Sequence, residues 1–149
     1  MRRGPAGQFG RREKFAGGIN ILINRKVDYA LRSLIFLAEK RDAEWSSTLE
    51  LSKKLRLPRV FLAKIVNALA RKKIVETQRG KAGGLRLLKK DATVAEVIKL
   101  LDPKFSLNKC LGESYSCFLE KSCSLHKLLK LIEKELFDKL SSVTIMELA

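Results

Sequence analysis

The chain has 149 residues, of which 46% are hydrophobic and 32% are charged, and its formal net charge is +15. This composition is typical of one globular domain and excludes a wholly disordered chain. The apolar runs are far shorter than the roughly 18 to 20 residues of a membrane-spanning helix, so a soluble, cytoplasmic protein with no membrane partner is expected.

The positive charge is concentrated in two segments. Residues 53–90 contain thirteen Lys or Arg residues and one acid, Glu76, whereas residues 1–20 contain five Lys or Arg residues and one acid, Glu13. A focused positive field attracts a polyanion, and these basic residues do not lie on a helix with a bulky apolar face. Double-stranded DNA is therefore the expected partner. Residues 1–20 show no helical periodicity and are expected to form a disordered basic extension.

The first elements of the chain predict a helix-turn-helix. Apolar residues from Val27 to Ala38 recur at helical spacing and predict a helix over residues 25–40. Ser47 and Glu50 form a capping-box pattern at the start of a short second helix. A third helix is predicted over residues 58–71. Its outer face is polar and basic, a pattern that a recognition helix and an ordinary solvated hairpin explain equally well. That face comprises Arg59, Ala63, Lys64, Asn67 and Arg71.

A predicted β-hairpin follows and favours the DNA-binding interpretation. Residues 74–77 and 85–87 have strand patterns, and a basic, glycine-rich loop joins them. A nucleotide-binding loop would be followed by a helix rather than a strand. Residues 21–90 are therefore predicted to be a winged helix-turn-helix, in which the loop reaches a DNA groove. The candidate DNA contacts are Arg59, Lys64, Asn67, Arg71, Arg79 and Lys81.

Residues 91–149 are predicted to pack with the winged helix as one unit and to carry a long helix over residues 124–140. Thr93 caps a shorter helix that ends at Asp102, and residues 144–148 form a final turn. The fold is thus mainly α with a small β-hairpin wing. The apolar stripe of the long helix is wider than one small domain can cover, which predicts a homodimer. The stripe comprises Leu125, Leu128, Leu129, Ile132, Leu136 and Leu140, with Leu131 and Phe137 outside it.

Four potential metal ligands lie within seventeen residues. They are Cys110, Cys117, Cys123 and His126, and the chain has no other Cys or His. An odd number of cysteines is a poor disulfide framework, and nothing indicates an oxyanion hole or a substrate cleft, so no enzyme is predicted. The gaps of six and five residues suit an iron–sulfur cluster better than the tight pairs of a zinc site. Structural zinc and metal-free redox thiols remain as alternatives.

Three features together resemble the bacterial winged-helix regulator family that contains IscR and NsrR. They are the segment from Arg25 to Arg32, the loop from Arg79 to Gly84, and the clustered cysteines; the resemblance covers residues 21–148. It implies a homodimer that places each recognition helix in a major groove of an operator and each wing in a minor groove. It also implies that the three cysteines ligate an iron–sulfur cluster through which redox state, nitric oxide or cluster supply changes operator affinity.

The resemblance leaves two candidates for the fourth ligand. His126 matches the histidine of the IscR-like branch, which binds a 2Fe-2S cluster, and it is the favoured choice. Asp28 matches the aspartate that the other subunit supplies to a 4Fe-4S cluster in the NsrR-like branch. Two departures matter: the first cysteine gap is six residues rather than five, and Ala63 replaces an acidic residue that discriminates between operators in the IscR-like branch. The operator sequence is therefore not carried over.

Overall fold

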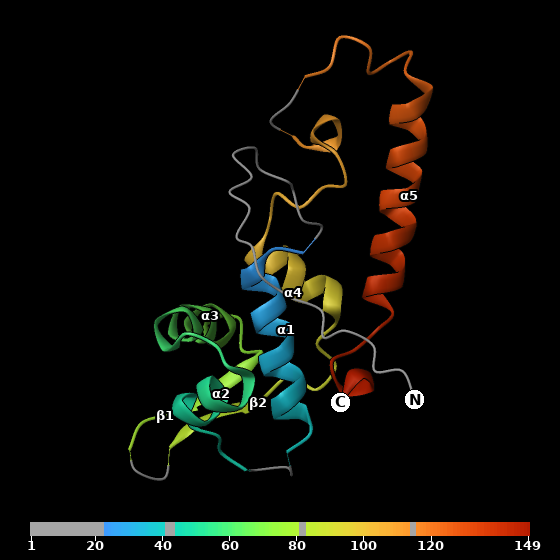
Figure 1. Ribbon diagram of the computed structural model, residues 1–149. Helices are drawn as coiled ribbons and strands as arrows, with labels where there is room; N and C mark the ends of the chain where they lie inside the picture. The colour runs from blue at the N-terminus through green and yellow to red at the C-terminus, as the bar shows by residue number, and fades with distance from the viewer. Residues whose placement is uncertain (1–22, 41–43, 81–82, 114–115) are drawn as a thin grey trace, which may run out of the picture.

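The computed structural model describes residues 23–40, 44–80, 83–113 and 116–149. The expected basic extension over residues 1–20 and the wing residue Lys81 lie outside these ranges. Within them the chain is mainly helical, with one two-stranded antiparallel hairpin, as predicted (Figure 1). The elements are α1 (Arg25–Ala38), α2 (Thr48–Leu55), α3 (Arg59–Arg71), β1 (Val75–Gln78), β2 (Gly84–Leu87), α4 (Val94–Leu101), the 3₁₀ turn η1 (Lys109–Leu111), α5 (Ser124–Ser141) and the 3₁₀ turn η2 (Met146–Leu148).

Helix starts are marked by the side chains that the sequence pattern predicted. The Ser47 hydroxyl accepts a hydrogen bond from the backbone N–H of Glu50, and the Thr93 hydroxyl accepts one from Glu96. Each bond satisfies an amide that the helix itself leaves free. Glu50 does not complete the capping box, because its carboxylate pairs with Lys40 at 2.9 Å. Pro58 lies just before α3 rather than in its first turn.

The core of the winged helix lies where α1, α3 and α4 meet. Each of these helices turns an apolar face inward, and the central leucines and isoleucines are fully buried. Asn24 joins two of the helices at their ends, because its side chain accepts the Val27 N–H and donates to Asp102 at 2.8 Å. Burial of these faces is the main stabilising term of the fold. Large core side chains include Leu34, Leu51, Leu62, Ile65, Leu69, Ile74, Leu85, Ile98 and Ile145.

The wing is attached to the start of α2. Strand β1 pairs with β2 from Val75 opposite Leu87 to Gln78 opposite Gly84. Ser46 adds a bridge to Leu85 through two backbone hydrogen bonds of 3.0 and 2.8 Å. Gly84 lies against the Ser46 carbonyl, where a Cβ would clash with the backbone, so the close approach requires glycine. The wing is thereby held beside the helix-turn-helix.

Helix α5 extends beyond the rest of the molecule (Figure 1). Its C-terminal half packs on α4, and the following segment returns to the core, where Ile145 is fully buried and its N–H bonds to the Ala92 carbonyl. Within the described part of the chain, its N-terminal half packs beside η1, and Cys123 of the cysteine-bearing segment caps it. None of the described residues of α5 is fully buried. No helix in the described ranges is long and apolar enough to cross a membrane.

The apolar residues of α5 form two faces rather than the single wide stripe predicted. Phe137, which we placed outside the stripe, points inward and packs edge-on against Phe105, with ring centroids 5.3 Å apart. Leu140 also packs against the core. Four large apolar residues of the N-terminal half are exposed, whereas Leu129 is half-buried. The exposed four are Leu125, Leu128, Leu131 and Ile132. The packing of Phe137 was not predicted, because periodicity locates apolar faces without showing which of them meets the core.

Candidate nucleic-acid interface and cysteine segment

One exposed stripe runs along α3. Its members are spaced by three or four residues and therefore share one face of the helix. Among them, Lys64 and Arg71 carry positive charge, and Arg59 lies beside the stripe in the first turn. None of these three cations has an acidic partner within the described part of the chain, so each is available to a phosphate. The stripe comprises Val60, Ala63, Lys64, Asn67 and Arg71.

The opposite face of α3 explains why the stripe is presented outward. Leu62, Ile65, Val66 and Leu69 are buried against α1 and the hairpin. This amphipathic division fixes the rotation of the helix about its axis. The arrangement of α2, a tight connection and α3 matches a helix-turn-helix, with Arg56 in the left-handed conformation (φ 52°) at the end of α2.

The wing presents Arg79 directly after β1, where its side chain is exposed. Arg86, by contrast, is engaged within the hairpin: it pairs with Glu76 at 2.7 Å and lies 4.7 Å above the Trp45 ring. The two arginines of the wing therefore differ in what they can bind. Arg79 remains a candidate DNA contact, whereas Arg86 stiffens the hairpin.

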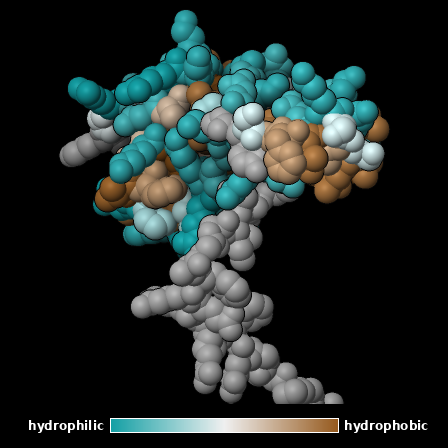
Figure 2. Space-filling model, turned by 90° about the horizontal axis from the view of Figure 1, so that it is seen from above, coloured by the Kyte–Doolittle hydropathy of each residue, from teal (hydrophilic) through white to brown (hydrophobic). Residues whose placement is uncertain are grey.

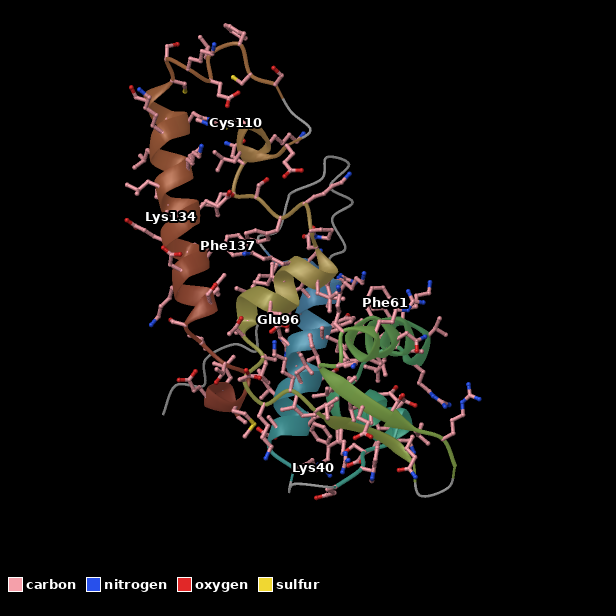
Figure 3. The ribbon with its side chains drawn as sticks, turned by 180° about the vertical axis from the view of Figure 1, so that it is seen from behind. Lys40, Phe61, Glu96, Cys110, Lys134 and Phe137 are labelled. Atoms are coloured by element: carbon pink, nitrogen blue, oxygen red, sulfur yellow. The ribbon has the colours of Figure 1, made fainter. Side chains whose placement is uncertain are left out.

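The three cysteines lie at different places along the segment from η1 to the start of α5. Cys110 is in η1, Cys123 is the N-cap of α5, and Cys117 lies between them; all three are half-buried free thiols. The Cys123 sulfur accepts the backbone N–H of His126 at 3.3 Å. Cysteine sulfur ligates soft metals and is open to oxidation, so a sulfur at this position can serve either chemistry. Figure 3 shows Cys110 on the short turn opposite α5.

A cavity of about 270 Å³ lies between η1 and α5. Two of the predicted ligands, Cys110 and His126, line it. The Nδ1 atom of His126 is buried and has no hydrogen-bond partner among the described residues, while Nε2 is 4.0 Å from the Glu120 carboxylate. A buried nitrogen without a partner is costly unless it binds something else. Charged residues complete the lining: Glu113, Glu120, Lys130 and Glu133.

The described residues do not bring the whole predicted ligand set together. In the ranges that the structure describes, no three His, Cys, Asp or Glu side chains converge closely enough to hold a metal ion. Cys117 and Cys123 lie outside the lining of the cavity. The assignment of Cys110, Cys117, Cys123 and His126 as ligands therefore stays a prediction. Two of the four donors, the Cys110 sulfur and the His126 imidazole, do line one cavity and have the chemistry of a soft-metal site.

Asp28 lies in the first turn of α1, on an element separate from the cysteine segment. Its carboxylate pairs with Arg32, one turn along the helix, at 2.8 Å. This hydrogen bond and the nearby negative charge raise the pKa of Arg32. The Asp28 side chain is 40% exposed, so another molecule could reach it. Its role as a ligand that the partner subunit supplies stays a prediction, because the structure contains one chain.

Glu133 connects the cysteine segment to α5, and no sequence pattern predicts this role. Its carboxylate accepts the backbone N–H of Leu107 at 2.6 Å, 26 residues earlier in the chain. It also lines both the 270 Å³ cavity and an adjoining one of about 500 Å³. Only the tertiary structure brings the two positions together, and a charged residue on a helix is otherwise assigned to solvent.

An apolar surface covers the outer side of α5 and the cysteine segment. Figure 2 shows hydrophobic residues gathered on the side of the molecule where α5 lies. Phe118 is 94% exposed and Leu128 is 52% exposed. Patches of this kind on a small protein mark a contact with another molecule. The outer apolar surface comprises Phe118, Leu119, Leu125, Leu128, Leu131 and Ile132.

Comparison with known proteins agrees with this architecture. The model of the Rrf2 family, described as "Iron-dependent Transcriptional regulator", matches residues 23–149. The HTH-type transcriptional regulator NsrR of Bacillus licheniformis is 32% identical over 124 residues, which cover 81% of this chain and 87% of that protein. The resemblance to the family of IscR and NsrR is thereby confirmed.

Two solved structures have the same fold. One is CymR (YrzC), titled the global cysteine regulator of B. subtilis, with a TM-score of 0.66, 26% identity and coverage of 85% of this chain and 95% of that one. The other is T. potens IscR, with a TM-score of 0.66, 18% identity and coverage of 87% and 86%. The similarity extends well beyond the winged helix, since each match spans most of both chains.

Proposed function

Because this chain belongs to the Rrf2 family of iron-dependent transcriptional regulators, we propose that the chemical state of its cysteine segment controls how tightly it binds an operator. In this proposal Cys110, Cys117 and Cys123 ligate an iron–sulfur cluster, with His126 as the favoured fourth ligand. A bound cluster would supply a centre that reacts with oxidants or nitric oxide and is lost when iron is scarce. The signal would be redox state, nitric oxide or cluster supply.

The observation that carries the proposal is the shared cavity of Cys110 and His126. The imidazole is mostly buried, and its unpartnered Nδ1 requires a ligand or a hydrogen bond. The other donors are near in sequence: Cys123 is three residues before His126 and Cys117 is six residues before Cys123. In the proposal, binding of the cluster would bring these donors together, because metal binding and the ordering of its ligands are coupled.

Contacts within the chain support a route from this segment to the DNA-reading face. Leu107 is bonded to Glu133 of α5, and Phe137 of α5 packs on Phe105 close to the end of α4. Helix α4 packs on α1, and α1 packs on α3. A change at the cysteines can therefore act on α5 and on the helices beneath it. The described contacts form a continuous packed route along which the two sites could be coupled, and double-mutant measurements along it would test that coupling.

The dimer is the second part of the proposal. The outer apolar surface on α5 is suited to a second copy of the chain, because isologous dimers pair the same patch on both subunits. A dimer would set the distance between two α3 helices, and binding to successive major grooves requires a separation of about 34 to 36 Å. A cluster-dependent shift of α5 would change that distance. A hundredfold change in affinity corresponds to about 2.7 kcal/mol.

A metal-free thiol sensor is the second candidate, and the position of Cys123 favours it. Cys123 is a half-buried free thiol at the start of α5, where its sulfur accepts the His126 N–H, so an oxidant can reach it. This sensor would need no iron and would respond to oxidation of Cys123 alone. A structural zinc site without a sensing role is the remaining alternative, since three cysteines and a histidine form an accepted zinc set.

Anaerobic purification followed by visible spectroscopy and iron, sulfide and zinc analysis tests the proposal. We expect broad absorption between about 320 and 460 nm, the region of sulfide-to-iron charge transfer, and about two iron per chain. Cys110→Ser, Cys117→Ser and Cys123→Ser should each remove it, whereas Ser122→Ala, next to Cys123, should not. About four iron per chain, sensitive to Asp28→Ala, would favour Asp28 over His126. One zinc per chain and no iron after reconstitution would overturn the cluster.

A further inference from the structure

Val60 is the anomalous residue of the α3 stripe. It is apolar, lies in the first turn of the helix, and its relative exposure is 74%. Exposed single apolar residues are common, but this one stands at the head of a face whose other members are polar, small or basic. Its neighbour Phe61 differs, because that ring packs edge-on against Tyr29 at 5.6 Å. Val60 has no such packing role, so its side chain is free to meet a ligand.

We propose that Val60 is a specificity-determining residue that reads thymine by packing against its C5-methyl group in the major groove. The inference rests on α3 being the DNA-reading helix and is independent of the chemistry at the cysteines. In helix-turn-helix proteins, residues near the N-terminus of the second helix reach the base edges. Thymine is the base that offers an apolar group there, and a small aliphatic side chain is the complementary contact.

The surroundings of Val60 favour DNA over an apolar protein partner. Arg59 precedes it, Lys64 follows it one turn later, and both are exposed without an acidic partner in the described part of the chain. Figure 3 places Phe61, the next residue, on α3 at the edge of the winged helix, away from α5 and its apolar surface. A ligand that seats on Val60 must therefore also accept positive charge on both sides. A phosphate backbone flanking a groove satisfies that requirement.

Ala63 extends the same small, apolar strip by one turn. Neither Val60 nor Ala63 can donate or accept a hydrogen bond, so neither can recognise guanine, cytosine or adenine through polar groups. The hydrogen-bonding residues of the stripe lie further along the helix: Lys64, Asn67 and Arg71. The stripe thus predicts a half-site in which thymine lies opposite the start of α3 and a base with hydrogen-bonding groups lies opposite its middle.

The test is a selection of duplexes from a randomised library by the full-length protein, followed by replacement of single thymines with deoxyuridine. Removing one buried methyl group should weaken wild-type binding by roughly three- to fivefold at one thymine of each half-site. Val60→Ala removes both γ-methyl groups, so it should reduce that methyl dependence while binding the uracil duplex as well as wild type does. Val60→Thr, which keeps one methyl group, should retain part of it. Leu88→Ala, an exposed apolar change outside α3, is the matched control.

Two outcomes would overturn the inference. If Val60→Ala shows the same uracil penalty as wild type, another side chain reads the methyl group. If uracil at every thymine leaves wild-type affinity unchanged, no methyl group is read at all. Both outcomes leave the cluster proposal untouched. A failure of that proposal would instead appear as a selected duplex that binds with equal affinity in every state of the cysteines.

Discussion

The winged helix and the α5 arm are built in opposite ways. In the winged helix, α1, α3 and α4 each bury four or more residues, and the core side chains are inaccessible to solvent. In α5 no residue is fully buried, although it is the longest described helix. The winged helix is therefore stabilised by a buried core of its own, whereas α5 is attached to it only along its C-terminal half. Regions of low local stability are the ones that regulation can move.

The largest expected contrast is in stability. Leu34→Ala should lower the free energy of unfolding by about 2 to 5 kcal/mol, because it removes a fully buried side chain and leaves a cavity. Leu128→Ala, on the exposed face of α5, should change it by less than about 0.5 kcal/mol at concentrations where the chain is monomeric. Urea denaturation followed by circular dichroism measures both. Equal losses would show that the arm is as tightly packed as the winged helix.

The next effect concerns the contact between the two regions. Phe137→Ala should cost about 1 to 3 kcal/mol, less than a fully buried phenylalanine, because the ring is only half-buried against Phe105 and beneath Lys99. The same variant should reduce the effect of cysteine modification on DNA affinity. Leu131→Ala, on the outer face of the same helix, is the control. Unaltered coupling in Phe137→Ala would remove the proposed route through α4.

The third prediction tests whether the outer apolar surface on α5 is a dimer interface. Leu128→Lys places a charge where a second copy is expected to pack, so the dimer dissociation constant should rise more than tenfold. Sedimentation equilibrium measures it. Leu88→Lys is the control, because Leu88 has a similar exposure of 48% but does not lie on α5. An unchanged dimer dissociation constant in Leu128→Lys would show that the interface lies elsewhere.

The smallest expected effect lies at the end of the chain. Backbone and hydroxyl hydrogen bonds from Thr144 lower the pKa of Glu147. A carboxyl group with a lowered folded-state pKa stabilises the protein above its ordinary pKa of about 4.3 and loses that contribution as pH falls through the lowered value. Thermal melts between pH 6 and 3 should therefore show a smaller acid-induced loss in Glu147→Gln. The same dependence of melting temperature on pH in the wild type and in Glu147→Gln would contradict this prediction.

The same division governs what could be predicted from sequence. Ser47 and Thr93 cap their helices as predicted, and the hairpin lies within one residue of its predicted ends, because capping and alternation are local signals. The inward orientation of Phe137, the bond from Leu107 to Glu133 and the exposure of Val60 were not predictable. Each depends on which neighbour a helix face meets, and that is decided by residues distant in the chain.

The sequence was enough to identify the cysteines and His126 as potential metal ligands. It was not enough to predict how these ligands are arranged in space. Ligand types and spacing are local, so they pointed to sulfur and imidazole chemistry at once. How Cys117 and Cys123 approach the cavity of Cys110 and His126 depends on the ligand itself, since metal binding and the ordering of its loop are coupled. The Cys123 sulfur also accepts the His126 N–H at the start of α5, a hydrogen bond that residue spacing does not reveal. Binding of a metal by this sulfur must either break that bond or leave it in place.

The central claim is that the state of the cysteines changes affinity for DNA, and it is tested most directly by measuring that affinity in two states of one preparation. Fluorescence anisotropy with a selected duplex at constant salt should give dissociation constants that differ at least tenfold between anaerobically purified protein and the same protein after oxidation or iron chelation. Cys117→Ser should give one value under both conditions. Identical constants for wild type in both states, with the cluster shown to be present and then lost, would contradict the account.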